Sequence, residues 1–379
     1  MRHVNVPEGW DLHKVSKVLT IKHGKSQREI VSPYGKFPVL ATGGEIGRTN
    51  TPIYTKPSVL IGRKGTIDKP QYMESPFWTV DTLFYSEIKS SIIPKYIFYL
   101  FQTINWQMFN EGSTLPSLSA NTIMNIKILM PPIAEQKKIA GILGTWDRAI
   151  EELAGLIAEK KKLKRGLMQR LLTGTQRLPG FNMAWKEIKC SDVLFERKTY
   201  LSKGKELEHV SLTKEGVVPK TARYERDFLV KGEEKEYKIT KLNDICYNPA
   251  NLKFGVICRN TYGDGIFSPI YVTFEVKNMD VVLLGFIVET HMFQGKALRY
   301  EQGTVYERMS VGAEDLLRVK LTMPSDMAEQ KAIADVLSKA DAEIDLLNQQ
   351  LDVLKEQKRG LMQKLLTGEI RVKVDTETC

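Results

Sequence analysis

The sequence repeats one 41-residue segment, and this repeat constrains the fold more than any other feature. Residues 134–174 align with residues 328–368 at a constant offset of 194, and 21 of the 41 positions are identical. Both copies open with AEQK and end with RGLMQ, one variable residue and LLTG. Repetition on this scale predicts that the chain contains two copies of one structural unit.

Each repeated segment has the apolar spacing of a long helix. Apolar residues recur at alternating steps of four and three over more than four heptads, which is the a/d pattern of a coiled coil. Proline precedes each segment and Thr-Gly ends it, as expected of a helix start and a glycine cap. We expect helix–helix packing at Ile139, Leu143, Trp146, Ile150, Leu153, Ile157, Ile333, Leu337, Ile344, Leu347, Leu351 and Leu354.

Lysines interrupt this apolar register at Lys160, Lys164 and Lys358. Two interpretations stay open. The lysines and their basic neighbours could form a belt that faces DNA or an acidic partner, or they could flank a coiled coil with their charged ends in solvent.

The segments ahead of the two helices vary more. Similarity persists around Trp10 and Trp185 at offset 175, and residues 75–78 correspond to residues 268–271 at offset 193. Residues 34–90 contain short β-rich runs between Gly and Pro turns, and residues 94–109 predict one aromatic helix. The second copy predicts strands near 228–230, 245–247, 254–258 and 270–276 and a helix near 280–297. The fold class is therefore α+β.

Charge favours a polyanionic partner. The chain has 55 Lys and Arg against 45 Asp and Glu, a net charge of +10, which indicates nucleic acid first and an anionic membrane surface second. The longest apolar run spans about eight residues, against roughly 20 for a membrane helix, so we expect no membrane association. The four cysteines form no CxxC pair, which is typical of a cytoplasmic protein rather than of a zinc or disulfide framework.

Catalytic motifs are incomplete. Asn248-Pro249-Ala250-Asn251 lacks the second proline and the aromatic residue of an adenine-methyltransferase loop, and no glycine-rich turn for S-adenosylmethionine accompanies it. Gly24-Lys25-Ser26 lacks the upstream glycine of a P-loop. We therefore expect no catalytic residue, no metal site and no cofactor in this chain.

Basic and polar residues on Gly-rich loops are the candidates for DNA contact. Arginine and lysine donate to phosphates and guanine edges, and asparagine pairs with adenine. The expected DNA-binding residues are Lys25, Arg48, Arg63, Lys64, Thr66, Ser113, Thr114, Lys214, Arg223, Tyr247, Asn248, Lys253, Arg259, Tyr306 and Arg308.

This architecture resembles the specificity (S, HsdS) subunit of type I restriction-modification systems. The resemblance rests on the two helix starts, PPIAEQK at 131–137 and PSDMAEQK at 324–331, on the repeated RGLMQxLLTG endings, and on the openings around Trp10 and Trp185. It covers nearly the whole chain.

The resemblance implies a non-catalytic subunit that binds double-stranded DNA. Two mixed α/β target recognition domains, residues 1–130 and 181–322, would be separated by two long antiparallel helices within 131–180 and 323–379. These helices would form a coiled coil with pseudo-two-fold symmetry. Each domain would read one half of a bipartite target, and the target would be asymmetric because the loops of the two domains differ.

The resemblance also implies partners and the cofactors that they carry. Two methyltransferase (modification) subunits with S-adenosylmethionine would dock on the helices, and restriction subunits with ATP and Mg would be further partners. The repeated helix ends predict partner binding at Arg165, Leu167, Met168, Leu171, Arg359, Leu361, Met362 and Leu365.

Three alternatives remain at this level. The chain could be the recognition subunit of a type II system with a fused nuclease–methyltransferase partner. It could be a coiled-coil scaffold without DNA specificity, although that would leave the basic loops unexplained. An autonomous enzyme would need a site that the motifs do not supply.

Overall fold

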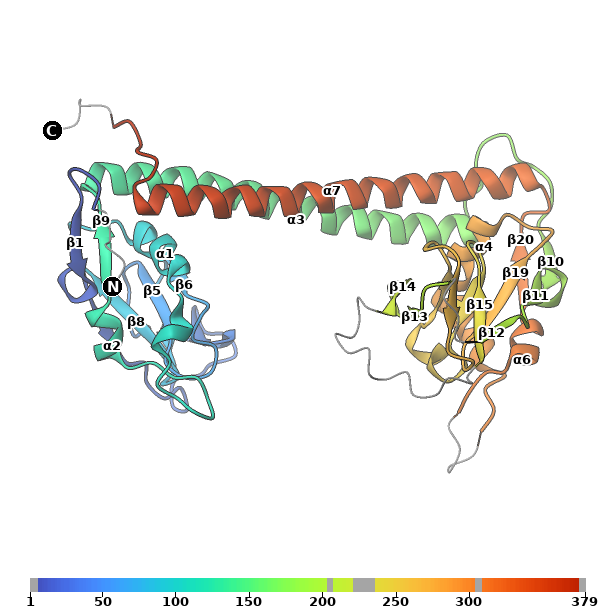
Figure 1. Cartoon of the computed structure of the whole chain (residues 1–379), viewed down its shortest axis with the longest axis horizontal. Coiled ribbons are helices and arrows are strands. Elements are labelled where there is room, and N and C mark those ends of the chain that lie inside the picture. The colour runs from blue at the N-terminus through green and yellow to red at the C-terminus, as the bar shows by residue number, and fades with distance from the viewer. Residues whose placement is uncertain (1–5, 203–206, 221–235, 304–308, 375–379) are drawn as a thin grey trace. The chain divides into compact units, whose positions relative to one another are not determined.

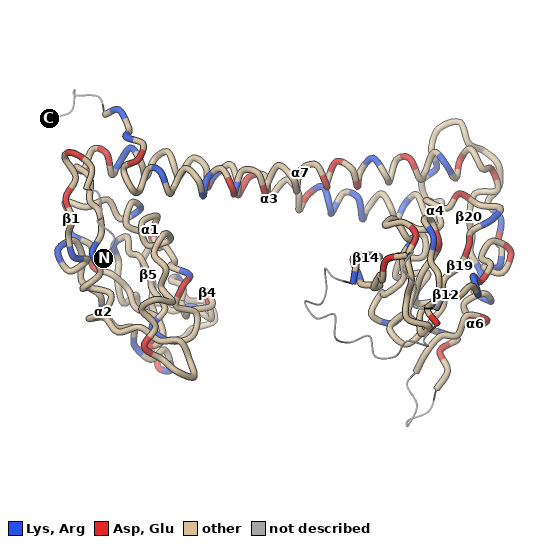
Figure 2. Tube along the Cα trace, in the orientation of Figure 1, with Lys and Arg blue, Asp and Glu red and all other residues tan. Residues whose placement is uncertain are grey.

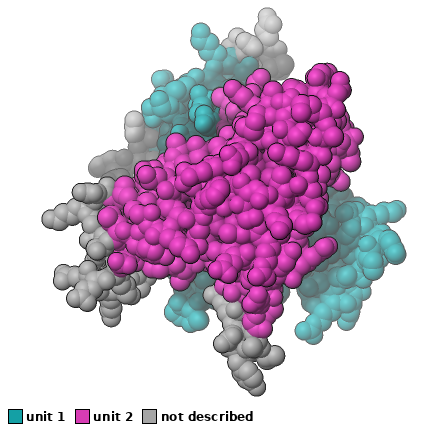
Figure 3. All heavy atoms as spheres, turned by 90° about the vertical axis from the view of Figure 1, so that its right-hand side faces the viewer, with its two compact units in different colours: residues 1–156, 348–379 teal, residues 157–347 magenta. Residues whose placement is uncertain are grey.

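A computed structural model describes residues 6–202, 207–220, 236–303 and 309–374, and it divides into two compact units (Figures 1 and 3). Unit 1 contains residues 1–156 and 348–379, and unit 2 contains residues 157–347. The two long helices, α3 (Ile133–Thr173) and α7 (Met327–Thr367), have 41 residues each. The division cuts both of them, so each unit holds part of each helix.

The described residues of unit 1 form three sheets. The first has the order β2 (Leu19–Lys22), β8 (Leu83–Ile88), β5 (Ser58–Gly62) and β6 (Gln71–Met73). The second has the order β4 (Gly44–Thr49), β3 (Phe37–Ala41) and β7 (Trp78–Thr79), and the third pairs β1 (Asp11–Lys14) with β9 (Lys127–Met130). The shorter helices are η1 (Val15–Lys17), α1 (Pro94–Thr103), η2 (Trp106–Phe109) and α2 (Ala120–Asn125).

Unit 2 repeats this plan. Its four-stranded sheet has the order β11 (Leu194–Glu196), β19 (Val272–Val276), β16 (Ile245–Tyr247) and β17 (Ile257–Arg259). Its other sheets are β12 (Tyr200–Ser202), β15 (Glu236–Thr240) and β18 (Gly265–Phe267); β13 (Val210–Leu212) and β14 (Val217–Pro219); and β10 (Lys186–Lys189) and β20 (Lys320–Met323). The described helices besides α3 and α7 are η3 (Cys190–Asp192), η6 (Pro249–Phe254), α4 (Val281–Val288), α5 (His291–Leu298) and α6 (Ala313–Leu317).

The α+β class and the internal repeat are both confirmed by this topology. The pair β1–β9 in unit 1 corresponds to β10–β20 in unit 2, and both are four-residue antiparallel ladders. In the four-stranded sheets, the register joins Leu19 to Ile88 in unit 1 and Leu194 to Val276 in unit 2. One chain therefore builds the same domain twice.

The long helices complete the core of each unit. In unit 1, Ile139 and Leu143 of α3 and Leu365 of α7 belong to one buried cluster with α1 and the first sheet. In unit 2, Leu171 of α3 and Leu337 of α7 occupy the corresponding cluster with α4. Apolar burial of this kind supplies most of the free energy of folding, so each domain depends on segments of both helices.

Two predicted helices are shorter in the structure. The expected helix 94–109 breaks after Thr103, and the 3-10 helix η2 follows, with Trp106 Nε1 donating to Phe101 O at 2.9 Å. The expected helix 280–297 is two helices that meet at 70°, because Thr290 starts a new one by accepting from Phe293 N at 3.2 Å. The strand expected near 228–230 lies outside the described residues.

The two long helices pack together, and within each unit they run antiparallel. In unit 1, Asp147 of α3 forms an ion pair with Lys358 of α7. In unit 2, Lys164 pairs with Asp341, and Lys160 Nζ lies 2.5 Å from Glu343. Acidic and basic residues occur along both helices (Figure 2). The three lysines that interrupt the apolar register therefore form ion pairs between the two helices.

None of the twelve expected packing residues is exposed. Ile139, Leu143, Ile157, Ile333, Leu337 and Ile344 are buried, and the other six are partly buried.

No single described helix combines the length and apolarity that a bilayer span requires. The bent pair α4 and α5 reaches these limits only when counted together, and both helices contribute side chains to the core of unit 2.

The backbone conformation at the end of α3 favours glycine. Gly174 has φ +72°, and a Cβ atom there would lie 3.2 Å from the Trp185 ring. We expect Gly174→Ala to lower the free energy of unfolding by about 1–3 kcal/mol, because an L residue is strained at this φ and must push the ring. Denaturant unfolding of the whole chain measures this effect.

Gly155→Ala is the matched control for this substitution. Gly155 lies inside α3, and a Cβ atom there meets nothing within 4 Å. Its replacement should raise stability by up to about 1 kcal/mol, because alanine favours the helix. Equal losses in the two variants would contradict the argument.

Candidate nucleic-acid interface

A buried glutamate anchors the start of α3 in unit 1. The side chain of Glu135 is 8% exposed, and its carboxylate accepts from Trp10 Nε1 at 3.2 Å and from Arg371 Nε at 3.0 Å. The Arg371 guanidinium also lies 5.7 Å from the Trp10 ring. Because a buried carboxylate is stable only when it is paired, these contacts hold three distant parts of the chain together.

The same arrangement occurs in unit 2 with the equivalent residues. Glu329 is fully buried, and its carboxylate accepts from Arg177 Nε at 2.6 Å, from Arg177 Nη2 at 2.7 Å and from Trp185 Nε1 at 3.3 Å. Arg177 follows α3 and binds the start of α7, whereas Arg371 follows α7 and binds the start of α3. Each repeat therefore supplies the arginine for the other repeat's glutamate.

A glutamine next to each glutamate joins the helix to its domain. Gln136 Oε1 accepts from Ile93 N at 3.0 Å, at the residue that precedes α1. In unit 2, Gln330 Oε1 accepts from Asp280 N at 2.9 Å, at the residue that precedes α4. The repeated Glu-Gln pair thus sets the position of the long helices and of the domain helix that packs beside them. We call the Glu, Gln, Trp and Arg set of each unit its clasp.

In unit 1 two loops meet on one face of the domain. The loop after β5 and the loop before α2 join through Gly65 N donating to Pro116 O at 2.8 Å and Leu118 N donating to Arg63 O at 2.9 Å. These bonds bring Arg63, Lys64 and Thr66 next to the loop that carries Ser113 and Thr114. Lys64, Ser113 and Thr114 are exposed, and Arg63 is partly buried with Nη1 donating to Asp81 O at 3.3 Å.

Unit 2 presents a different loop at the corresponding position. There, Val311 N donates to Pro249 O at 3.2 Å. This hydrogen bond corresponds to the one from Leu118 N to Arg63 O in unit 1. Arg63 and Pro249 are thus structurally equivalent, which the offset of the repeat does not reveal. The loop of η6 therefore replaces the Arg-Lys-Gly-Thr loop of unit 1.

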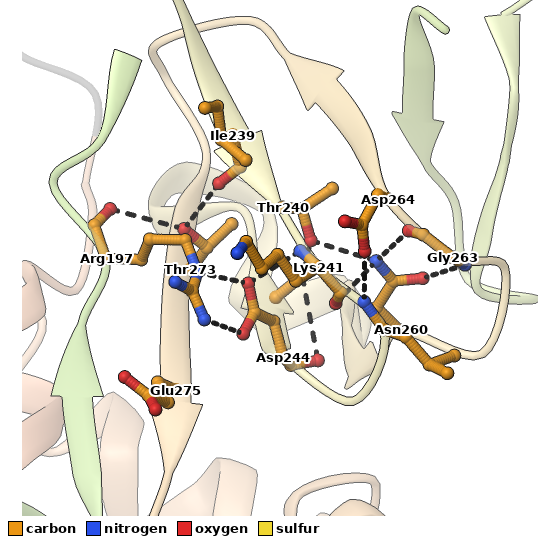
Figure 4. A network of polar contacts seen from close by, with 12 residues as sticks. Arg197, Ile239, Thr240, Lys241, Asp244, Asn260, Gly263, Asp264, Thr273 and Glu275 are labelled. Carbon is orange, nitrogen blue, oxygen red and sulfur yellow. Dashed lines mark hydrogen bonds and ion pairs between the residues drawn. The ribbon is translucent and has the colours of Figure 1, made fainter. Parts of the chain in front are cut away.

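The hairpin that carries this loop is fixed at its far end by a buried polar network (Figure 4). Arg197 donates to Asp244 through Nε at 2.8 Å and Nη2 at 2.9 Å. Asp244 directly precedes β16, and its carboxylate also accepts from Lys241 N at 2.8 Å. Asn260 Nδ2 donates to Thr240, Lys241 O and Gly263 O. None of the buried side-chain N and O atoms described in this network lacks a hydrogen-bond partner. Such a network rigidifies the strand ends that carry it.

The structure separates the expected DNA-binding residues of unit 2. Lys214 and Asn248 line one hollow, with Lys253 exposed on the same loop. Arg259 donates to Asn243 Oδ1 at 2.8 Å and lines a second hollow against α4 and α7. Arg223, Tyr306 and Arg308 lie outside the described residues.

Tyr247 does not fit the expected role, and that prediction is wrong. Its ring is fully buried and stacks on Phe274 at 6.1 Å between centroids, while its hydroxyl donates to Val311 O at 3.0 Å. Burial raises the pKa of the phenol above its ordinary value. Tyr247 therefore supports the loop from below and cannot contact a ligand at the surface.

Two expected residues of unit 1 are not part of the two joined loops, since Arg48 is in β4 and Lys25 lies between β2 and β3. Arg48 Nε and Nη2 donate to Gly35 O and Lys36 O at 2.9 and 3.0 Å, so this guanidinium braces a neighbouring turn. Lys25 is exposed beside β7, and its backbone N–H donates to Thr79 O. Their contact with DNA stays a prediction.

The expected partner-binding surface needs correction. Leu171, Met362 and Leu365 are buried in the cores of the chain's own units, so these three cannot dock a partner. Leu167, Met168 and Leu361 are partly buried against the same cores. The spacing predicts a helix face, and that face packs on the β-rich domains of the chain itself. Arg165 and Arg359 remain exposed.

Comparison with known proteins places this geometry in a family. A family model, the type I restriction modification DNA specificity domain, matches residues 7–161. The specificity subunit of type I restriction enzyme MjaVIII from Methanocaldococcus jannaschii is 23% identical, over 98% of this chain and 96% of its own. A putative MjaX specificity subunit of the same organism is 25% identical over 75% of this chain and 70% of its own.

Solved structures agree with the fold. The S subunit of a type I restriction-modification system from M. genitalium superposes with a TM-score of 0.63 at 15% identity, covering 97% of both chains. A chain from a structure on complex assembly and conformational transition of the type I R-M system gives 0.56 at 14% identity, covering 97% of this chain and 100% of that one. The chain resembles the specificity subunits of type I restriction enzymes over nearly its whole length, and residues 7–161 match the family model. It is a DNA specificity subunit, which is the non-catalytic component of the enzyme.

Sequence reasoning missed the clasp of the specificity subunit. The repeated AEQK motif identified the helix starts but left the Glu and Gln without a role. The signal was present, since Arg177 and Arg371 also stand at offset 194. Among the described residues, no group of three or more His, Cys, Asp or Glu side chains could hold a metal ion.

The clasp predicts a large loss of stability when its arginine is removed. Arg177→Ala leaves the fully buried Glu329 carboxylate with Trp185 as its remaining clasp donor. We expect the free energy of unfolding to fall by clearly more than an exposed ion pair contributes, because the buried Glu329 carboxylate loses its cationic partner. Adding Glu329→Gln should recover part of this loss, as measured by denaturant unfolding.

An exposed ion pair in the same unit provides the control. Arg318 Nη1 lies 3.2 Å from Asp315, and the Arg318 side chain is 63% exposed. Arg318→Ala should change stability by less than about 1 kcal/mol, since solvent screens this pair. A loss from Arg177→Ala no larger than that from Arg318→Ala would show that the clasp is dispensable.

Proposed function

We propose that each unit carries one target recognition domain that reads one half of an asymmetric bipartite DNA sequence. The carrying observation is the pair of equivalent hydrogen bonds, Leu118 N to Arg63 O and Val311 N to Pro249 O. They support two different loops on one scaffold. Because base edges are read by the side chains that reach them, loops of different composition favour different half-sites.

The domain limits of this proposal are residues 1–130 and 181–322 for recognition, and 131–180 and 323–379 for the helical segments. Arg63, Lys64, Thr66, Ser113 and Thr114 would contact DNA in the first domain, and Lys214, Asn248 and Lys253 in the second. The net charge of +10 supports such contacts, since DNA phosphates attract basic surfaces.

We propose two methyltransferase subunits as partners, docked on α3 and α7. The corrected docking surface uses the exposed positions of the repeated segment, Arg165 and Gln169 on α3 and Arg359 and Gln363 on α7. Each pair lies one helical turn apart on one face, and the two pairs are identical, as two copies of one partner require. S-adenosylmethionine would belong to these subunits, and ATP and Mg to restriction subunits.

A cytoplasmic location completes the proposal. Cys190, Cys246 and Cys258 are buried free thiols, and burial raises the pKa of Cys190 and Cys258 to about 12.

Exchange of one recognition domain tests the reading of half-sites. Replacing residues 1–130 with the first domain of another family member, chosen to keep a Trp equivalent to Trp10, should change one half of the methylated sequence and leave the other intact. Mapping of methylated adenines in a host that supplies the methyltransferase gives the result. The reciprocal exchange of residues 181–322 should change the opposite half, and alteration of both halves by either exchange would refute modular reading.

We further propose that α3 and α7 set the gap between the half-sites. Insertion of seven residues after Leu153 and after its equivalent Leu347 keeps the a/d register and adds about 10 Å to each helix. The lengthened protein should prefer a longer central gap, with both half-site sequences unchanged. Selection from a library of randomised gap lengths measures this preference, and an unchanged gap in a folded, active complex would refute the proposal.

A further inference from the structure

Unit 2 has an open hollow beside the η6 loop, with a volume of about 570 Å³. The turn between β13 and β14 forms one wall, and the loop from Asn248 to Val256 forms the other. Its volume falls within the range of about 300–1,000 Å³ that is typical of small-ligand pockets. The hollow adjoins the loop that is equivalent to the Arg-Lys-Gly-Thr loop of unit 1.

An exposed aromatic ring stands at this hollow. Phe254 is the last residue of η6 and is 54% exposed. Gly255 follows with φ +78° and ends the helix, and Lys253 Nζ lies 5.5 Å from the Phe254 ring centroid. An apolar ring that gains little from burial within its own chain, with a cation beside it, suits stacking against a ligand.

Two of the other lining groups, Tyr271 and Asn248, are held in place by contacts within the chain. Tyr271 is partly buried, and its ring packs 5.0 Å from the Phe267 centroid. Asn248 Oδ1 accepts from Ala250 N at 3.1 Å, which orients the amide so that Nδ2 is the group left to donate. Lys214 and Glu215 are exposed at the turn of the hairpin.

These groups match a nucleobase better than a phosphate or an acyl chain. A base has flat faces for Phe254 and Tyr271 and a polar edge for the Asn248 amide. An exocyclic amino group can donate to Glu215, as carboxylates accept from cytosine N4. Lys214 and Lys253 can meet the flanking phosphates. A base inside the duplex offers only its edges, so a pocket with aromatic walls needs a base that has left the stack.

We propose that this hollow binds one base of the second half-site in an extrahelical position, with Phe254 as the stacking residue. The inference rests on the proposed DNA recognition by unit 2 and specifies its mechanism. The described loop of unit 1 that replaces η6 contains Arg63, Lys64 and Thr66 and no aromatic residue. The two half-sites would therefore be read by different means.

Fluorescent duplexes test the proposal once methylation mapping has supplied the target. In the full chain, alone and with its methyltransferase, binding to duplexes with 2-aminopurine at successive positions should raise fluorescence at one position of the second half-site. A mismatch at that position should tighten binding about tenfold, because the base is already partly unpaired. Phe254→Leu should abolish both effects and weaken specific binding about tenfold or more.

Phe195→Leu is the matched control. Phe195 is 42% exposed in the same unit, with Lys277 Nζ 5.2 Å from its ring, but it lies on β11 away from the hollow. It should bind all duplexes as the unchanged chain does. The proposal is overturned if Phe254→Leu binds DNA as Phe195→Leu does. It is also overturned if Phe254→Leu weakens binding to specific and nonspecific duplexes equally.

Three further outcomes separate a different occupant of the hollow, a failure of DNA recognition as a whole, and a failure of the extrahelical base alone. If Phe254→Leu impairs assembly with the methyltransferase while DNA binding is unchanged, the hollow holds a protein side chain and the proposal fails. If the unchanged chain and its complex show no sequence-specific DNA binding, the proposed function itself fails. If the chain binds its target specifically but 2-aminopurine fluorescence rises at no position, the proposal of an extrahelical base fails while the proposed function stands.

Discussion

The buried carboxylate at the start of each long helix is the interaction on which the architecture depends. A carboxylate cannot remain charged in an apolar interior without partners, and Glu329 is fully buried. Its partner Arg177 follows the other long helix, three residues after Gly174, whose positive φ turns the chain back at the helix end. In unit 1, Glu135, Gly368 and Arg371 repeat the arrangement. Each domain is thereby completed by a residue that belongs to the other repeat.

The contacts of the long helices are alike in the two units, whereas the loops of the two domains differ. The contacts between α3 and α7 are nearly duplicated, since Lys358 pairs with Asp147 beside Tyr99 and Lys164 pairs with Asp341 beside Phe286. The loop that carries Arg63 in unit 1 and the η6 loop that takes its place in unit 2 differ in residue type. A specificity subunit can accept new loops as long as the clasp and the helix contacts remain, because those contacts involve none of the loop side chains.

Periodic features of the sequence predicted the scaffold, and non-periodic contacts decided the rest. The a/d spacing from Ile139 to Leu354 and the glycine after each helix follow from local geometry, which sequence patterns record. The same spacing could not show that Leu171 and Leu365 face the chain's own domains, because a second apolar face has the same period. Tyr247 was a wrong candidate because the side chain of a strand residue next to a loop can face either the solvent or the core. In the structure its ring faces the core and stacks on Phe274. The equivalence of Arg63 and Pro249 is invisible in the sequence, because insertions change the offset within the domains.

The exchange of arginines between repeats also has a consequence for biosynthesis. Unit 2 is a continuous stretch, residues 157–347, whereas unit 1 begins the chain and is finished by residues 348–379. At about 5–20 residues per second, the ribosome needs roughly 10–45 s to travel from Ile139 to Leu365. Throughout that interval, Glu135 has no Arg371 and the apolar face of α3 lacks its cover from α7. The domain that is made first is therefore the last to be completed, and its half-built state is the one most exposed to aggregation or capture by a chaperone.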